Sequence, residues 1–248
     1  METKVLKFID IHCHYDDLSL NKLKSDFDSK KQISVTASVS FNSYKKLETI
    51  EKEKIPGLYF AYGLYPDVIL NYPLEECLTQ IDKIDFSKAI AVGEIGLDYK
   101  ITKDLEKRKE ELVVFEKQLE IAEKLNLPAI IHTRYATKKT LDVLTTTKHN
   151  KIILHWFDGN AEEIKTALDR GYYLTQRFAK PLIPDIKEHL DNIFIETDYP
   201  VPYAGGSVEI KDIEKSYEVF CNTYNLEKEF VKEKIQNNFL NLFPNINI

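Results

Sequence analysis

The sequence alternates short β-rich runs with longer amphipathic stretches, and no linker rich in Pro, Gly or Ser interrupts the alternation. Runs of this kind, rich in β-branched and aromatic residues, predict strands. Eight are predicted, over 7–13, 34–39, 58–63, 89–95, 128–132, 151–156, 172–175 and 193–197. Apolar residues recur at helical spacing over 41–54, 73–84, 104–126, 135–148, 160–170 and 210–242. The helical pattern is weakest in the second of these segments and after the seventh strand.

Eight strand–helix units without a linker predict an α/β chain folded as a single (β/α)8 barrel of the TIM type over residues 1–248. Its rival is an open, doubly wound sheet. The sequence has neither a GxGxxG nor a GxxxxGK[ST] turn, which counts against a nucleotide-binding version of that rival. A barrel brings the C-terminal ends of its strands to one mouth, so we expect the active site there.

The composition is that of a globular protein, with 43% hydrophobic and 30% charged residues. A net charge of -6 and a pI of about 5.6 argue against a protein that grips nucleic acid through a broadly basic surface. A metal-assisted enzyme acting on phosphates is still compatible with this charge. The sequence shows no apolar run close to the roughly 18 residues of a membrane span, and no secretory pattern at its start. We therefore expect a cytoplasmic protein without membrane partners.

Histidines gather at the predicted strand ends. The chain has six histidines, and four of them, His12, His14, His132 and His155, lie at or just past the C-terminal end of a strand. His12 and His14 share one face of their strand, since side chains alternate with a period of two. Such a pair could bind one metal ion, or it could be a polar feature of the core. Imidazole nitrogens combined with carboxylate oxygens suit zinc, manganese or magnesium.

Two carboxylates occupy equivalent places. Glu94 interrupts an otherwise apolar strand, and its two oxygens could bridge two cations in a catalytic centre. The alternative is a buried structural ion pair. Asp198 ends the last strand before a Pro-containing loop, where it could ligate a metal and take the proton from an attacking water, or simply form a turn. Asp98 suits a turn cap and a site role equally, and Glu196 shares the parity of Asp198 and could make a hydrogen bond inside the barrel.

Five motifs then point to a family. With five motifs in a fixed order, the sequence resembles the TatD-like metal-dependent DNases of the amidohydrolase superfamily over essentially the whole chain. Each motif is weak alone, but five in the right order at strand–helix spacing are specific. They are DIHCH at 10–14, GEIGLDY at 93–99, PAIIHTR at 128–134, ILHWFDG at 153–159 and ETDYP at 196–200.

The resemblance implies a barrel that binds two or three divalent cations, Mg, Mn or Zn. It also implies that cation-activated water hydrolyses DNA phosphodiester bonds, typically from a strand end. The implied ligands are His12 and His14 for one cation, His132 and His155 for another, Glu94 as the bridge, and Asp198 as the last ligand of the first cation and as the base.

The sequence departs from the family pattern at three places. Tyr65 replaces the histidine that usually follows the third strand, and could donate a hydrogen bond to a phosphate. Arg134 keeps an arginine for a phosphate, whereas Tyr135 replaces the acid that usually follows it. Trp156 could stack on a base, although strand parity favours packing outward against a helix.

Three further side chains complete the predicted substrate contacts. Arg177 and Lys180 follow the seventh strand, where barrels often bind phosphate, with solvated surface as an equal alternative. Tyr203, together with Tyr199, could stack on unpaired bases, with ordinary loop packing as the alternative.

These observations predict a divalent-metal-dependent deoxyribonuclease whose DNA substrate is single-stranded or carries an end. The HWF variant looks like TatD-like nucleases of bacterial antiphage cassettes, which implies an antiviral role with protein partners in a larger assembly. One alternative is a small-molecule amidohydrolase or esterase on the same barrel. Another is a non-catalytic subunit that binds nucleic acid ends. Glu94 stands where several amidohydrolases carry a carbamylated lysine, which favours the nuclease, and the intact ligand set favours an enzyme.

Overall fold

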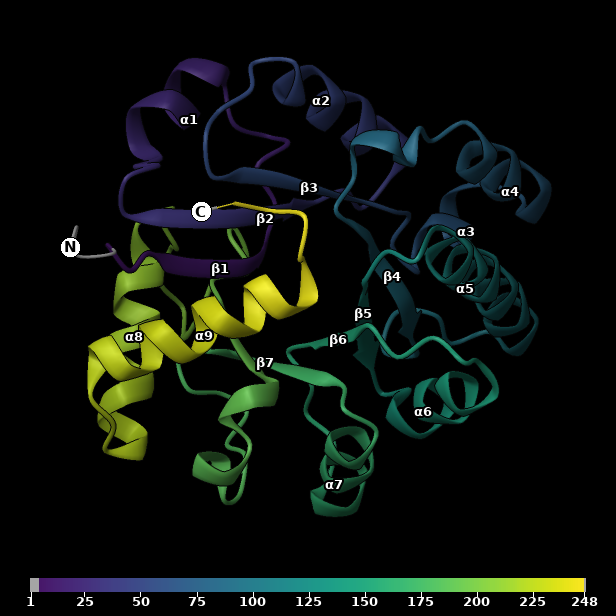
Figure 1. The fold of residues 1–248 in the computed structure, drawn as a ribbon. Helices are drawn as coiled ribbons and strands as arrows, with labels where there is room; N and C mark the ends of the chain where they lie inside the picture. Colours follow the sequence, from purple (N-terminus) through teal and green to yellow (C-terminus); the bar gives the residue numbers. More distant parts are fainter. Residues whose placement is uncertain (1–4, 248) are drawn as a thin grey trace.

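Eight parallel strands in sequential order form the centre of the computed structural model, which describes residues 5–247 (Figure 1). All eight predicted strands are present, and each end lies within three residues of the predicted one. The strands are β1 (Phe8–Cys13), β2 (Gln32–Ala37), β3 (Leu58–Tyr62), β4 (Ala91–Asp98), β5 (Ala129–Arg134), β6 (Ile152–His155), β7 (Tyr173–Arg177) and β8 (Ile193–Glu196). The predicted barrel architecture is therefore confirmed.

Helices surround the strands (Figure 1). They are α1 (Leu20–Asp26), α2 (Phe41–Glu51), α3 (Val68–Asn71), α4 (Leu74–Asp82), α5 (Leu105–Leu125), α6 (Thr137–Thr146), α7 (Ala161–Asp169), α8 (Asp212–Tyr224) and α9 (Lys228–Leu242). Among residues 5–247, no helix is both long and apolar enough to cross a membrane.

The helix boundaries depart from the sequence pattern in three places. The short helices α1 and α3 were not predicted. The predicted segment 210–242 is two helices, because Asn225 adopts a left-handed φ of 50° and caps the end of α8. After β7 the chain forms only 3₁₀ turns, at Ile186–Glu188 and Leu190–Asn192, where the helical pattern is weak.

The barrel closes where β1 meets β8. Each sequential pair from β1–β2 to β7–β8 has a parallel register, whereas the last junction uses a few individual bonds. The backbone N–H of Asp198 donates to the His12 carbonyl at 3.0 Å. Thr197 donates from its backbone N–H and its hydroxyl to the buried carboxylate of Asp10, at 2.9 and 2.7 Å. This closure places Asp198 beside His12.

The two C-terminal helices support the same junction, and Figure 1 shows α9 running alongside β1. The Ile9 N–H donates to the Tyr217 hydroxyl of α8 at 3.0 Å, and that hydroxyl donates to the Ile9 carbonyl at 3.2 Å. From α9, the Asn238 side-chain amide donates to the carbonyls of Leu190 and Ile193, at 2.8 Å each. Buried polar side chains thus satisfy backbone groups that the sheet leaves unpaired at this junction.

Tyr217→Phe should reduce stability without changing the mouth of the barrel. The substitution removes one buried hydroxyl and leaves the Ile9 N–H and carbonyl unpaired, which costs about 1–3 kcal/mol of unfolding free energy. Urea denaturation followed by circular dichroism measures the loss. Tyr135→Phe is the matched control, because Tyr135 is 74% exposed and should shift stability by no more than about 0.5 kcal/mol. Equal unfolding midpoints for the two variants would contradict this account.

Candidate metal centre

The six predicted ligands come together at the C-terminal ends of the strands. His12 and His14 stand at the end of β1, His132 and His155 belong to β5 and β6, and Asp198 follows β8. Glu94 lies inside β4, because this strand continues to Asp98, three residues beyond its predicted end. The six residues come from five strands of the barrel, so the fold alone makes them neighbours.

The carboxylate of Glu94 lies between two pairs of histidines. Its Oε2 is 3.4 Å from His12 Nε2 and 3.3 Å from His14 Nε2. Its Oε1 is 2.9 Å from His132 Nδ1 and 3.9 Å from His155 Nε2. One carboxylate therefore faces four imidazoles, with one oxygen toward each pair.

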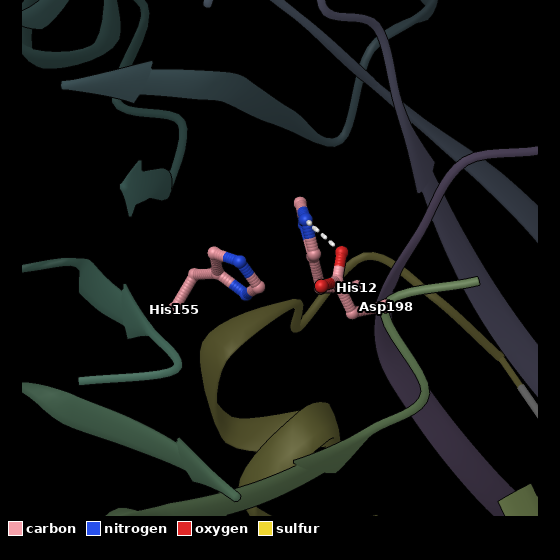
Figure 2. Close-up of side chains that lie close together, drawn as sticks. All are labelled: His12, His155 and Asp198. Carbon is pink, nitrogen blue, oxygen red and sulfur yellow. Dashed lines mark ion pairs between the residues drawn. The ribbon is translucent and has the colours of Figure 1, made fainter. Parts of the chain in front are cut away.

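Asp198 closes the cluster on the side of β1. Its Oδ1 lies 3.7 Å from His12 Nε2 and 3.5 Å from His14 Nε2. Figure 2 shows His12 between His155 and Asp198, with the contact to Asp198 dashed. The His12 and His155 rings are 4.0 Å apart between centroids.

The donors of this cluster fit metal ions. Three overlapping groups have ligand atoms within 4.8 Å of one another, and they consist of His12, His155 and Asp198; of His12, His14 and Glu94; and of Glu94, His132 and His155. His12 is fully buried, yet among residues 5–247 neither of its ring nitrogens has a hydrogen-bond partner. Burial and the nearby His155 lower the pKa of His12, which keeps its imidazole neutral and able to donate a lone pair.

Each of the other three histidines has one ring nitrogen that contacts an oxygen outside the cluster, and for His132 this contact is between Nε2 and Asp98 Oδ2 at 3.2 Å. His14 Nδ1 is 3.0 Å from the Ala37 carbonyl, and His155 Nδ1 is 3.0 Å from the Glu196 carboxylate. Contacts of this kind fix the ring and leave the other nitrogen for a metal. Glu196 thus makes the expected hydrogen bond inside the barrel. Burial lowers the pKa of His155, but the charge and hydrogen bond of Glu196, together with the charges of Asp198 and Glu94, outweigh it and raise that pKa to about 9.

Asp98 holds several groups at the end of β4, and the sequence had left its role undecided between a turn cap and a site residue. Its Oδ1 caps the turn after β4 by accepting the N–H groups of Lys100 and Ile101, at 3.0 and 3.2 Å. Its Oδ2 accepts the Tyr65 hydroxyl at 2.7 Å and Arg134 Nε at 2.8 Å. Turn cap and site role are therefore both present. The sequence carried a signal for the site role, because Asp98 lies an even number of residues after Glu94 and therefore shares its face of the strand.

The mouth opens into a cavity of about 420 Å³, called here the mouth cavity. Beside five of the six cluster residues, Tyr65, Arg134 and Trp156 line it. The position of Trp156 contradicts the outward packing that strand parity favoured. Trp156 follows the end of β6 with a left-handed φ of 40°, so the alternation of a strand no longer applies and the ring turns toward the cavity.

Arg177 is neither solvated nor placed at the mouth cavity. Its side chain is fully buried, its Nη1 lies 3.3 Å from Asp198 Oδ2, and its Nη2 donates to the Val201 carbonyl. A direct phosphate contact by Arg177 is therefore not supported, and the guanidinium instead holds Asp198. The sequence pattern predicted a rim position for Arg177. The loop after β8 covers the end of β7 instead, and the sequence of β7 carries no sign of this loop packing.

Lys180 and Tyr203 line a different cavity, of about 620 Å³, called here the second cavity. They therefore do not join the six-residue cluster. Tyr199 packs against Tyr15, with 5.6 Å between ring centroids, as its packing alternative predicted.

A barrel of eight parallel strands with histidines and carboxylates gathered at its C-terminal mouth is the architecture of a metal-dependent hydrolase. The model of the TatD-related DNase family matches residues 9–244, and the chain belongs to this family. The protein is thus a metal-dependent hydrolase of the TatD family.

Individual relatives agree with this assignment. An uncharacterized metal-dependent hydrolase of Methanocaldococcus jannaschii is 28% identical over 252 residues, which cover 96% of this chain and 97% of the relative. The human deoxyribonuclease TATDN3 is 26% identical over 266 residues, covering 96% and 95%. The crystal structure of the TatD homolog YJJV from Escherichia coli has the same fold, with a TM-score of 0.80 and 21% identity over 98% of this chain and 100% of that one.

Glu196→Gln should weaken cation binding. Glu196 is fully buried and its negative charge holds the His155 ring, so its neutralisation should cost about 10–100-fold in metal affinity. Titration of metal-free protein with Mn²⁺ or Zn²⁺ in a calorimeter measures the change. Glu188→Gln, at an exposed position, is the control with the same chemical change. Equal affinities in both variants would show that Glu196 has no part in the metal centre.

Proposed function

We propose that this hydrolase cleaves phosphodiester bonds of DNA, in a substrate that is single-stranded or presents a strand end. The observation that carries the proposal is the position of Glu94, whose two oxygens each face a pair of histidines. Such a carboxylate suits a site for at least two cations, and paired cations serve in-line displacement at phosphorus. The family name and the human relative named a deoxyribonuclease support DNA as the substrate.

In this proposal the cluster divides into two sites that share Glu94. His12, His14 and Asp198 would hold one cation, and His132 and His155 would hold the other. Bound divalent cations at such a centre polarise phosphoryl oxygens, activate water near neutral pH and stabilise the leaving oxygen. Their charge also offsets the acidity of the chain at the point where a phosphate must approach.

Asp198 is the proposed base. Burial raises its pKa, but the nearby histidines, His14 first and then His155 and His12, together outweigh this and lower the pKa, which keeps the carboxylate ionised. Arg177 holds Oδ2, so Oδ1 is the oxygen turned toward His12 and His14. A fixed, ionised carboxylate at this edge of the mouth cavity can accept the proton of an attacking water.

Arg134 and Trp156 are the proposed substrate contacts in the mouth cavity. Asp98 orients the guanidinium of Arg134, whose side chain is still 38% exposed and can therefore meet a phosphate. The half-buried ring of Trp156 offers a stacking surface for an unpaired base. A cytoplasmic location, a role in antiphage defence and protein partners stay predictions from the sequence.

Glu94→Ala and metal removal should each abolish DNA cleavage. The residue lies at the mouth of the barrel, away from its stability face, so the variant should stay folded by circular dichroism. The assay uses end-labelled single-stranded and duplex DNA with Mg²⁺, Mn²⁺ or Zn²⁺, beside a panel of amides and esters. Undiminished cleavage by verified metal-free protein would refute the mechanism. Turnover of an amide or ester without any cleavage of DNA would favour the small-molecule hydrolase.

Tyr65→Phe should keep the metal content and lower the rate. The Tyr65 hydroxyl lies 2.7 Å from Asp98 and 3.0 Å from His132 Nε2, and burial raises its pKa, so it stays a neutral donor and a poor ligand. The hydroxyl proton goes to Asp98, which also holds Arg134, so its loss should disturb substrate positioning and cost on the order of 10- to 1000-fold in rate. Elemental analysis and the DNA assay measure both quantities. A variant that sheds a cation would show that Tyr65 is a ligand, and an unchanged rate would show that it only packs.

A further inference from the structure

The second cavity lies between two tight turns, one at the carboxyl end of β7 and one in the loop that follows β8. In the first turn, Arg177 and Lys180 exchange backbone hydrogen bonds of 2.9 Å each, and in the second, Tyr203 and Gly206 do so at 3.1 and 2.9 Å. Both central residues of each turn are left-handed, and they are Phe178 (φ 47°), Ala179 (φ 55°), Ala204 (φ 50°) and Gly205 (φ 81°). The two turns therefore have the dihedral pattern of type I′ turns.

Three of the four central residues are not glycine, so the turns hold a strained backbone. A left-handed residue with a Cβ persists only where its surroundings fix it, and such residues concentrate at ligand sites. Here the Phe178 N–H donates to the Ser216 hydroxyl at 3.0 Å, and the Phe178 ring packs against Tyr203 with 4.7 Å between centroids. The two turns thus each place one aromatic side chain, Phe178 and Tyr203, beside the cavity.

Helix α8 supplies the remaining wall. Asp212, Lys215, Val219 and Thr223 line the cavity at a spacing of three or four residues, which places them on one helix face. The cavity of about 620 Å³ falls within the range of about 300–1000 Å³ that small-ligand sites occupy. Its lining combines an apolar surface with charges near it.

The charges of the lining favour an anion. Lys180 and Lys215 line the cavity, and neither forms an ion pair within residues 5–247. Asp212 is the one acidic side chain among the lining residues, and its carboxylate accepts the Glu209 N–H at 2.9 Å. The Lys215 ammonium lies 5.7 Å from the Phe178 ring centroid, so a cation and an aromatic face stand together. A ligand with a planar ring and a phosphate matches this arrangement.

Arg177 separates the second cavity from the mouth cavity. Its guanidinium carbon lies 5.1 Å from the ring centroid of Trp156, which lines the mouth cavity. The same carbon lies 5.4 Å from the ring centroid of Tyr203, which lines the second cavity. The two cavities are thus neighbours across one buried side chain, close enough for a single polymer strand to occupy both.

We propose that the second cavity binds an unpaired nucleotide of the DNA strand whose cleaved bond lies at the metal centre. The base lies against Tyr203 and Val219, and the phosphate lies near Lys215. This inference rests on the proposed function and adds a second point of attachment outside the metal centre. It also gives Lys180 and Tyr203 a place in substrate binding that the metal cluster does not offer them.

The test measures binding by the full chain in the presence of a chelator, so that cleavage and cation contacts are absent. The probes are a fluorescein-labelled oligodeoxythymidylate of about eight nucleotides and an abasic strand of equal length, followed by anisotropy. Lys215→Glu should weaken binding of both probes about tenfold or more and reduce the slope of log affinity against log salt by about 0.7 or more. Val219→Trp, which fills the cavity, should weaken only the probe that carries bases, by about tenfold.

Lys187→Glu is the matched control, because Lys187 is exposed and does not line the second cavity. The affinity of Lys187→Glu for the two probes should change less than that of Lys215→Glu. Equal losses for the two lysine variants would indicate a general charge effect and overturn the inference. Equal losses of both probes with Val219→Trp, or no binding by the unmodified chain, would also overturn it. The proposed function is judged separately, by cation-dependent cleavage in the unmodified chain.

Discussion

The contact between the buried Glu94 carboxylate and four imidazoles is the interaction on which the rest of the site depends. A carboxylate that is only 3% exposed is costly to bury unless charges or hydrogen bonds compensate it. Burial raises the pKa of Glu94, but the surrounding histidines, His12 first, outweigh it and lower the pKa well below its ordinary value. Histidines from β1, β5 and β6 can supply this compensation only where a closed barrel brings those strands around β4.

The closure between β1 and β8 contributes both to the stability of the barrel and to the geometry of the site. Asp10 is buried, and although burial raises its pKa to about 7, the bonds from Thr197 hold the two strands together at the mouth. One residue beyond Thr197, Asp198 reaches His12 and His14. On the opposite wall, Asp98 plays the comparable part for Tyr65 and Arg134. Buried carboxylates that do not join the cluster thus orient the side chains that form the mouth.

The fold does not specify a substrate, since the same barrel supports many reactions. The arrangement of the two cavities is more informative, because it extends the mouth beyond the metal cluster. Arg177 lies between Trp156 and Tyr203 and also holds Asp198, so one buried cation connects both cavities to the proposed base. The cations that a chain with a net charge of -6 can present to an anionic polymer are Arg134 at the mouth cavity and Lys180 and Lys215 at the second cavity.

Local periodicity in the sequence determined the eight strands and the faces on which His12, His14 and Glu94 lie, because strand alternation needs only near neighbours. It also held the signal for Asp98, which shares the parity of Glu94. The tertiary structure alone decided where Trp156 and Arg177 point. Trp156 leaves the strand with a left-handed backbone, and Arg177 is covered by a loop that follows the next strand. The directions of these two side chains depend on how the loops at the mouth pack against one another. The sequence pattern within a single loop does not encode that packing.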